Sequence, residues 1–147
     1  MKSILIYGYG NPGRQDDGVG PALVEALELW QAADGVSVMT LETNYQLNAE
    51  DALTVAGHDQ VIFADATREG DAPFTFRRLL PDTAVSFSTH AMRPESILAL
   101  ADELYGKSPK TYLLTIRGYE WEPNEPMTRG AVANLAAALD FLKLNPF

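Results

Sequence analysis

The sequence predicts an α/β fold, a three-layer α/β/α sandwich with a mainly parallel, twisted sheet of about five strands and one antiparallel edge strand. Short apolar runs of strand length alternate with longer segments of helical apolar spacing, and this repeated β-α-β order favours parallel strands covered by helices on both faces. The length of 147 residues suits one core. No linker, repeat or low-complexity segment interrupts the sequence, so we expect a single domain over residues 1–147.

The expected strands occupy residues 2–7, 36–41, 61–64, 74–80 and 112–116. Residues 4–7, within the first expected strand, and residues 61–64 are continuous apolar runs, which are typical of buried strands. Residues 36–41 alternate and are rich in strand-forming side chains. Residues 74–80 alternate only in part, which indicates a half-exposed strand at a sheet edge.

The expected helices occupy residues 19–30, 48–56, 94–105 and 130–144. Apolar residues of the first helix recur at helical spacing. The second has Asn48 as its cap and acidic residues in its first turn. The third has Pro94 near its start and Gly106 after its end, and the last is rich in alanine.

Composition excludes several classes of function. The sequence contains no cysteine, which rules out disulfides, thiolate nucleophiles and zinc–cysteine sites and fits a cytoplasmic protein. The net charge of −9 argues against binding to nucleic acids or to anionic membranes, since both require a basic surface. No apolar run approaches the roughly 20 residues that span a bilayer, and the N-terminus does not resemble a signal peptide.

The most informative segment is the glycine-rich loop after the first strand, Gly10-Asn-Pro-Gly-Arg-Gln-Asp-Asp-Gly18. A strand that leads into such a loop commonly prepares a ligand site. Here the loop ends with the adjacent carboxylates of Asp16 and Asp17, which repel phosphate and attract a cation. The loop therefore predicts a cation site.

Further acidic residues and one histidine follow other expected strands. Ligands of parallel sheets bind beyond the carboxyl ends of the strands, so we expect these side chains to converge there. The candidates are Asp16, Asp17, Glu42, Asp65 and His90. Like charges gathered at one edge raise each other's pKa unless a cation joins them. His58 precedes a strand at the opposite end of the sheet, so we leave it out of the site.

Each candidate alone also has a structural interpretation. Asp16 or Asp17 could cap the following helix, and Asp65 could hold a loop through an Asx-turn. Glu42 could be a solvated strand end, and a lone histidine such as His90 is more often structural than a ligand. The presence of the whole set at one edge favours a site.

A dinucleotide site is a different interpretation of the same loop. Gly8-Tyr-Gly-Asn-Pro-Gly13 fits the G-x-G-x-x-G pattern, and Glu42 stands where an acid would bind the ribose. However, the helix starts too late after Gly13, and Asp16 and Asp17 place negative charge where a pyrophosphate should lie. We therefore reject it.

Three motifs resemble those of the hydrogenase maturation proteases. They are Gly10-Asn11…Asp16-Asp17-Gly18-x-Gly20, Ala64-Asp65-Ala66 and Ser88-Thr-His-x-Met92. The resemblance covers nearly the whole chain in element order and length. It implies an endopeptidase that removes a C-terminal extension from the large-subunit precursor of a nickel-iron hydrogenase once nickel is in place.

By position, the resemblance assigns the nickel contacts to Asp17, Asp65 and His90. We expect substrate contacts from Gly10, Asn11, Asp16 and Glu42, although the family often has Asp where this chain has Glu42. Two carboxylates and an imidazole leave positions open on a divalent ion that is shared with another molecule. The nickel would thus be supplied by the precursor, and we expect the protein to act as a monomer.

The catalytic group stays unassigned, but the lack of cysteine and of a Gly-x-Ser-x-Gly elbow argues against an acyl-enzyme. One alternative is a non-enzymatic nickel-binding maturation chaperone, which would use the same three ligands. Another is a peptidyl-tRNA hydrolase-like esterase, whose match ends at Gly13 and which would need a basic surface for tRNA. The segments 73–80 and 119–126 are candidates for partner recognition.

Overall fold

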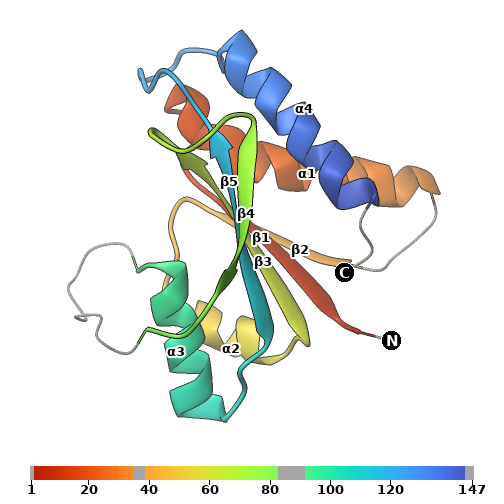
Figure 1. The fold of residues 1–147 in the computed structure, drawn as a ribbon, viewed down its shortest axis with the longest axis vertical. Coiled ribbons are helices and arrows are strands. Elements are labelled where there is room, and N and C mark those ends of the chain that lie inside the picture. Colours follow the sequence, from red (N-terminus) through yellow and green to blue (C-terminus); the bar gives the residue numbers. More distant parts are fainter. Residues whose placement is uncertain (1, 35–38, 83–91, 145–147) are drawn as a thin grey trace.

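The structure is a computed structural model that describes residues 2–34, 39–82 and 92–144. Its core is one five-stranded sheet with the strand order β2-β1-β3-β5-β4 (Figure 1). The strands are β1 (Ile4–Tyr9), β2 (Met39–Asn44), β3 (Gln60–Thr67), β4 (Phe74–Leu79) and β5 (Lys110–Arg117). β4 pairs antiparallel with β5 and the other pairs are parallel, which confirms the predicted fold class and antiparallel edge strand.

Helices cover both faces of the sheet (Figure 1). On one face lie α1 (Val19–Asp34), which follows the short 3₁₀ helix η1 (Gln15–Gly18), and α4 (Arg129–Leu144). On the other lie α2 (Asp51–Ala56) and α3 (Pro94–Tyr105). None of the helices in the described ranges is both long and apolar enough to cross a membrane.

Two hydrophobic cores follow from the alternation of side chains along the strands. Ile4 and Ile6 of β1 pack in the core beneath α1 and α4, whereas Leu5 and Tyr7 pack in the core beneath α2 and α3. Successive strand residues point to opposite faces, so a strand covered on both sides must be apolar at every position. This is why residues 4–7 appear in the sequence as an unbroken apolar run.

The order of the strands in the sheet changes direction at β1, because β2 and β3 lie on opposite sides of it. From β1 the chain crosses through α1 to β2 on one side, and it then returns through α2 to β3 on the other side of β1. Open α/β sheets bind ligands at such a switch point, beyond the carboxyl ends of the two strands. In this chain those ends are followed by the glycine-rich loop and carry Asp65.

Close packing of α1 on β1 explains two of the glycines. A Cβ atom added to Gly8 would lie 2.2 Å from the carbonyl oxygen of Gly20, and one added to Gly20 would lie 2.6 Å from the carbonyl oxygen of Ala64. Only glycine permits this approach. The start of α1 is thereby held directly against β1 and β3 at the switch point.

Several element boundaries differ from the prediction, and among the strands the ends of β2 and β3 differ most. β2 was expected to end at residue 41 but continues through Glu42 to Asn44, and β3 was expected to end at residue 64 but continues through Asp65 to Thr67. Pairing with β1 and β5 extends them, because polar residues can complete a ladder as well as apolar ones. Residues 36–38 of the expected second strand lie outside the described residues.

The predicted cap of the second helix was wrong. α2 begins at Asp51, and the residue at its N-cap is Glu50, without a side-chain hydrogen bond. Instead, the carboxylate of Asp51 accepts a hydrogen bond from the backbone N–H of Asn48 at 2.8 Å and one from the hydroxyl of Tyr7 at 2.9 Å. The preceding turn is therefore fixed by Asp51 rather than by the side chain of Asn48.

Candidate functional site

Asp17 and Asp65 line one hollow at the carboxyl end of β3. The hollow has a volume of about 390 Å³, and its other lining residues are Ala66, Thr67, Arg68, Glu69 and Trp121. The structure thus brings together two of the three residues that were predicted to contact nickel. Below, this feature is called the Asp17–Asp65 hollow.

The loop after β1 holds Asp17 in place. The backbone N–H of Asn11 donates a hydrogen bond to the carboxylate of Asp17 at 2.8 Å, and the side-chain oxygen of Asn11 accepts one from the N–H of Gly13 at 2.8 Å. Gly10 has a φ of 143°, and a Cβ atom added to it would lie 2.0 Å from the carbonyl oxygen of Asp17. Gly10 and Asn11 therefore shape the loop around Asp17, and their direct contact with substrate stays a prediction.

Asp16 has a different position from its neighbour, because its side chain is completely buried. Its carboxylate accepts hydrogen bonds from the backbone N–H groups of Tyr119 (2.7 Å), Glu120 (3.1 Å) and Thr128 (2.8 Å), and from the hydroxyl of Thr128 (2.7 Å). Burial alone would raise the pKa of Asp16, but these hydrogen bonds outweigh it and lower the pKa. Asp16 ties η1 to residues 119–128, and its predicted contact with substrate stays a prediction.

The carboxyl group of Asp65 has a raised pKa. Burial raises its pKa to about 6, and the negative charge of Asp17 adds to the shift. Hydrogen bonds from the backbone N–H of Ala66, at 2.8 Å, and from the hydroxyl of Tyr9 oppose it. Burial and the nearby Asp65 also raise the pKa of Tyr9. A divalent cation between Asp17 and Asp65 would relieve the repulsion that raises the pKa of Asp65.

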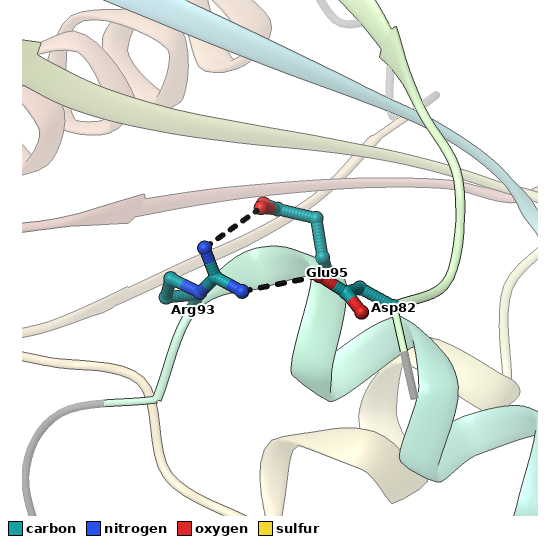
Figure 2. A network of polar contacts seen from close by, with 3 residues as sticks. All are labelled: Asp82, Arg93 and Glu95. Atoms are coloured by element: carbon teal, nitrogen blue, oxygen red, sulfur yellow. Dashed lines mark hydrogen bonds and ion pairs between the residues drawn. The ribbon is translucent and has the colours of Figure 1, made fainter. Parts of the chain in front are cut away.

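The third predicted ligand, His90, lies outside the described residues. Figure 2 shows the residues on either side of segment 83–91, where Arg93 contacts Asp82 at 3.2 Å and Glu95 at 3.9 Å. The charge of Glu95, in the first turn of α3, adds to the raised pKa of Tyr9, whose hydroxyl bonds Asp65. Among the described residues, no group of three His, Cys, Asp or Glu side chains could hold a metal ion.

The candidate Glu42 lies away from the Asp17–Asp65 hollow, as does His58, which was left out of the predicted site. Glu42 is exposed within β2, in register with Tyr7 of β1, and does not line the hollow. Its substrate contact stays a prediction. His58 lies just before the amino end of β3, and its Nδ1 atom is 2.7 Å from the carbonyl oxygen of Thr54. The structure thus places it at the opposite end of the sheet, as expected.

Sequence reasoning did not find several residues of the hollow, namely Thr67, Arg68, Glu69 and Trp121, nor Tyr9, whose hydroxyl bonds Asp65. Trp121 lies within the 119–126 segment that was marked for partner recognition, but nothing tied it to Asp65. Because β5 is parallel to β3, the chain that follows β5 must leave at the same edge of the sheet. The rule that located Asp65 could therefore also have located Trp121.

The geometry of the loop argues against a dinucleotide. η1, which carries both acidic residues, separates Gly13 from the start of α1 at Val19. A pyrophosphate would thus meet carboxylates rather than free N–H groups at a helix start. This agrees with the interpretation of the sequence.

No protein-family profile and no curated protein matches this chain. Among solved structures, the [NiFe] hydrogenase maturation protease HycI from Thermococcus kodakarensis is 19% identical with a TM-score of 0.70, and the match covers 96% of this chain and 90% of that chain. The hydrogenase maturating endopeptidase HybD from E. coli is 26% identical with a TM-score of 0.68, over 97% and 90% of the two chains. The endopeptidase HycI from Escherichia coli is 23% identical with a TM-score of 0.69, over 97% and 90%. The chain therefore has the fold of the hydrogenase maturation proteases, and the resemblance inferred from its three motifs is confirmed.

Proposed function

We propose that this protein is an endopeptidase that removes the C-terminal extension of a nickel-iron hydrogenase large-subunit precursor. The observation that carries the proposal is the Asp17–Asp65 hollow, which lies at the switch point of a fold shared with hydrogenase maturation endopeptidases. A peptidase of this kind acts on one partner, and the hollow is small enough to admit one segment of chain rather than a folded surface.

Nickel would enter this site as part of the substrate. Asp17 and Asp65 offer carboxylate oxygens, and His90 would add an imidazole nitrogen, a mixed donor set that suits a divalent ion with positions left for ligands from the precursor. Binding would require loss of the proton from Asp65, whose pKa is raised to about 6. Nickel recognition would therefore strengthen as the pH rises through that value.

Selection of loaded precursor follows from the same charges. A precursor without nickel would bring no cation to Asp17 and Asp65, and covering the hollow would then bury their negative charges unpaired. The cost of burying unpaired charge discriminates against the empty precursor without any contact to the rest of its surface.

Intact-mass spectrometry tests the proposal. A large-subunit precursor from the same organism is incubated with and without this protein, once loaded with nickel and once nickel-free. We expect loss of one defined C-terminal peptide, and only from the nickel-loaded precursor in the presence of the protein. Persistence of the full-length mass in a precursor shown to contain nickel contradicts the proposal.

A nickel-binding maturation chaperone is the second candidate. It is favoured by the hollow itself, whose described lining supplies carboxylates and a guanidinium but no serine or cysteine nucleophile. In that case the protein would form a nickel-dependent complex with the precursor without releasing a peptide. A peptidyl-tRNA hydrolase-like esterase is disfavoured, because Asp17 and Asp65 would repel the phosphates of tRNA.

A further inference from the structure

We propose that Arg68, held on the ring of Trp121 beside the Asp17–Asp65 hollow, binds a carboxylate of the precursor segment that enters the hollow. This inference rests on the proposed function for the identity of the ligand. It makes Arg68 a specificity-determining residue, because it selects a precursor that carries an acidic group next to its nickel.

The guanidinium of Arg68 occupies a defined place. Its central carbon lies 4.3 Å from the centre of the Trp121 ring, and both residues line the hollow with Asp17 and Asp65. Within the described ranges, Arg68 makes no ion pair and no hydrogen bond, whereas the ion pairs found there all involve Arg93. The N–H groups of Arg68 thus stay available to a ligand.

The turn that carries Arg68 is fixed on three sides. The hydroxyl of Thr67 accepts a hydrogen bond from the N–H of Gly70 at 3.1 Å. The guanidinium of Arg117 donates to the carbonyl of Gly70 at 2.8 Å, and the N–H of Gly118 donates to the carbonyl of Thr67 at 3.0 Å. These bonds anchor the backbone on both sides of Arg68 to the end of β5.

The ring beneath Arg68 is fixed as well. Asp16 binds the two backbone N–H groups that precede Trp121, and the side-chain oxygen of Gln15 accepts a hydrogen bond from the N–H of Glu122 at 3.1 Å. A Cβ atom added to Gly118 would lie 2.9 Å from the Trp121 ring, so the ring packs directly on the backbone there. The fixed ring restricts the otherwise exposed side chain of Arg68, which therefore loses less freedom when it binds.

The chemistry of the hollow selects a carboxylate as the ligand. A guanidinium presents its donors in a planar fork that matches the two oxygens of a carboxylate. A phosphate carries more negative charge, so Asp17 and Asp65 would repel it more strongly. The carboxylate can come from an Asp or Glu side chain of the precursor or from its C-terminus, and the test separates these sources.

A direct test uses short peptides and the fluorescence of Trp121. The background variant is Trp30→Phe, which leaves Trp121 as the only tryptophan. The probes are acetyl-Gly-Glu-Gly-amide, with a side-chain carboxylate, acetyl-Gly-Gln-Gly, with a terminal carboxylate, and acetyl-Gly-Gln-Gly-amide, with none. We expect at least one acidic peptide to bind about fivefold more tightly than the uncharged one, and the peptide that does so identifies the source.

Variants decide whether Arg68 causes this preference. Arg68→Gln is expected to remove it, while Arg77→Gln, at an exposed arginine of β4, retains it. Equal binding of the three peptides to the parent protein, or a preference that survives in Arg68→Gln, overturns the inference.

Kinetics on nickel-loaded precursor separate this inference from the proposed function. We expect Arg68→Gln to raise KM about fivefold with little change in kcat, because Arg68 binds the segment without touching the reacting bond. If the wild-type protein cleaves the precursor and Arg68→Gln has the same KM, the inference is wrong and the proposed function stands. If the wild-type protein does not cleave at all, the proposed function is wrong and the peptide titration alone decides the role of Arg68.

Discussion

Two adjacent aspartates have different surroundings in this protein. Successive residues of a 3₁₀ helix point about 120° apart, so the side chains of Asp16 and Asp17 leave η1 in different directions. Asp16 points inward to residues 118–128, whereas Asp17 faces the hollow beside Asp65. The sequence alone could not separate a structural carboxylate from a ligand within this pair, because both lie next to the start of a helix.

Because Asp16 is buried and Asp17 lines the hollow, we expect substitution of Asp16 to affect stability and substitution of Asp17 to affect docking. Asp16→Asn removes charge from a buried acceptor of several hydrogen bonds, so we expect it to lower the free energy of unfolding by about 2 kcal/mol. Asp17→Asn loses little stability but is expected to weaken docking of nickel-loaded precursor by about tenfold. Thermal unfolding and a precursor binding titration of both variants check this. Equal losses of docking would show that the structural and ligand roles are assigned wrongly.

The raised pKa of Asp65 predicts a pH effect on stability. Its pKa is about 6 in the folded chain and about 4 in the unfolded chain, so the folded state binds the proton more tightly. The stabilising contribution is therefore fully present below pH about 4 and is lost as the pH rises through about 6. The side chain of Asn in Asp65→Asn stays neutral at every pH. At pH 7, the free energy of unfolding of this variant is therefore expected to exceed that of the metal-free wild type by about 2 kcal/mol.

Unfolding of this variant and the wild type in denaturant, at several pH values, measures the difference. It should shrink towards zero below pH about 4, where Asp65 is protonated in both states. If Asp65→Asn were more stable than the wild type by the same amount at every pH, the extra stability would come from packing rather than from charge.

At the scale of elements, the loop after β1 acts as a rigid holder for Asp17. Gly10 adopts a φ of 143°, and a side chain there would collide with the backbone of Asp17. We expect Gly10→Ala to displace Asp17 and to lower both stability and nickel-dependent docking. Gly13→Ala is the matched control, since its added Cβ atom would meet only the side-chain oxygen of Asn11, at 3.2 Å.

Thermal unfolding and the same docking titration apply to both glycine variants. Gly13→Ala should remain close to the wild type in each. Similar effects of Gly10→Ala and Gly13→Ala would show that the conformation at Gly10 has no special importance for the site.

The sequence predicts the elements well where one face of each element is apolar. The helix over residues 94–105 has the boundaries that were expected, with Gly106 in the left-handed conformation after it. β2 and β3 were expected to end too early because their last residues are polar, and only pairing with neighbouring strands keeps them extended. A rule about strand ends located Asp17 and Asp65, but it says nothing about which loops bend back to meet, as those of Arg68 and Trp121 do.

At the scale of the whole molecule, the two layers of helices leave one functional edge of the sheet. The loop after β1, the end of β3 and the chain after β5 all reach this edge and form the Asp17–Asp65 hollow. The net charge of −9 adds a negative field around it, which favours a cationic ligand over a nucleic acid. Under the proposed function, this edge would present the carboxylates of Asp17 and Asp65 to a metal that the precursor brings.

The two histidines provide a matched pair of variants for this arrangement. His90→Ala is expected to abolish precursor processing with little change in Tm, because the resemblance makes His90 a nickel contact. His58→Ala, at the opposite end of the sheet, should leave processing unchanged. Processing is followed by the mass of the precursor and stability by thermal unfolding. Retained processing in His90→Ala together with a large drop in Tm would make His90 a structural residue.

We expect Asp17 and Asp65 to bind nickel that is held by the precursor, and X-ray absorption at the nickel edge measures this contact. Spectra are recorded for nickel-loaded precursor alone, and for mixtures frozen before cleavage with the wild type or with the Asp17→Asn, Asp65→Asn double variant. We predict that nickel gains oxygen or nitrogen neighbours on mixing with the wild type and gains fewer with the double variant. Unchanged nickel coordination in a wild-type mixture that goes on to release the peptide would contradict this expectation.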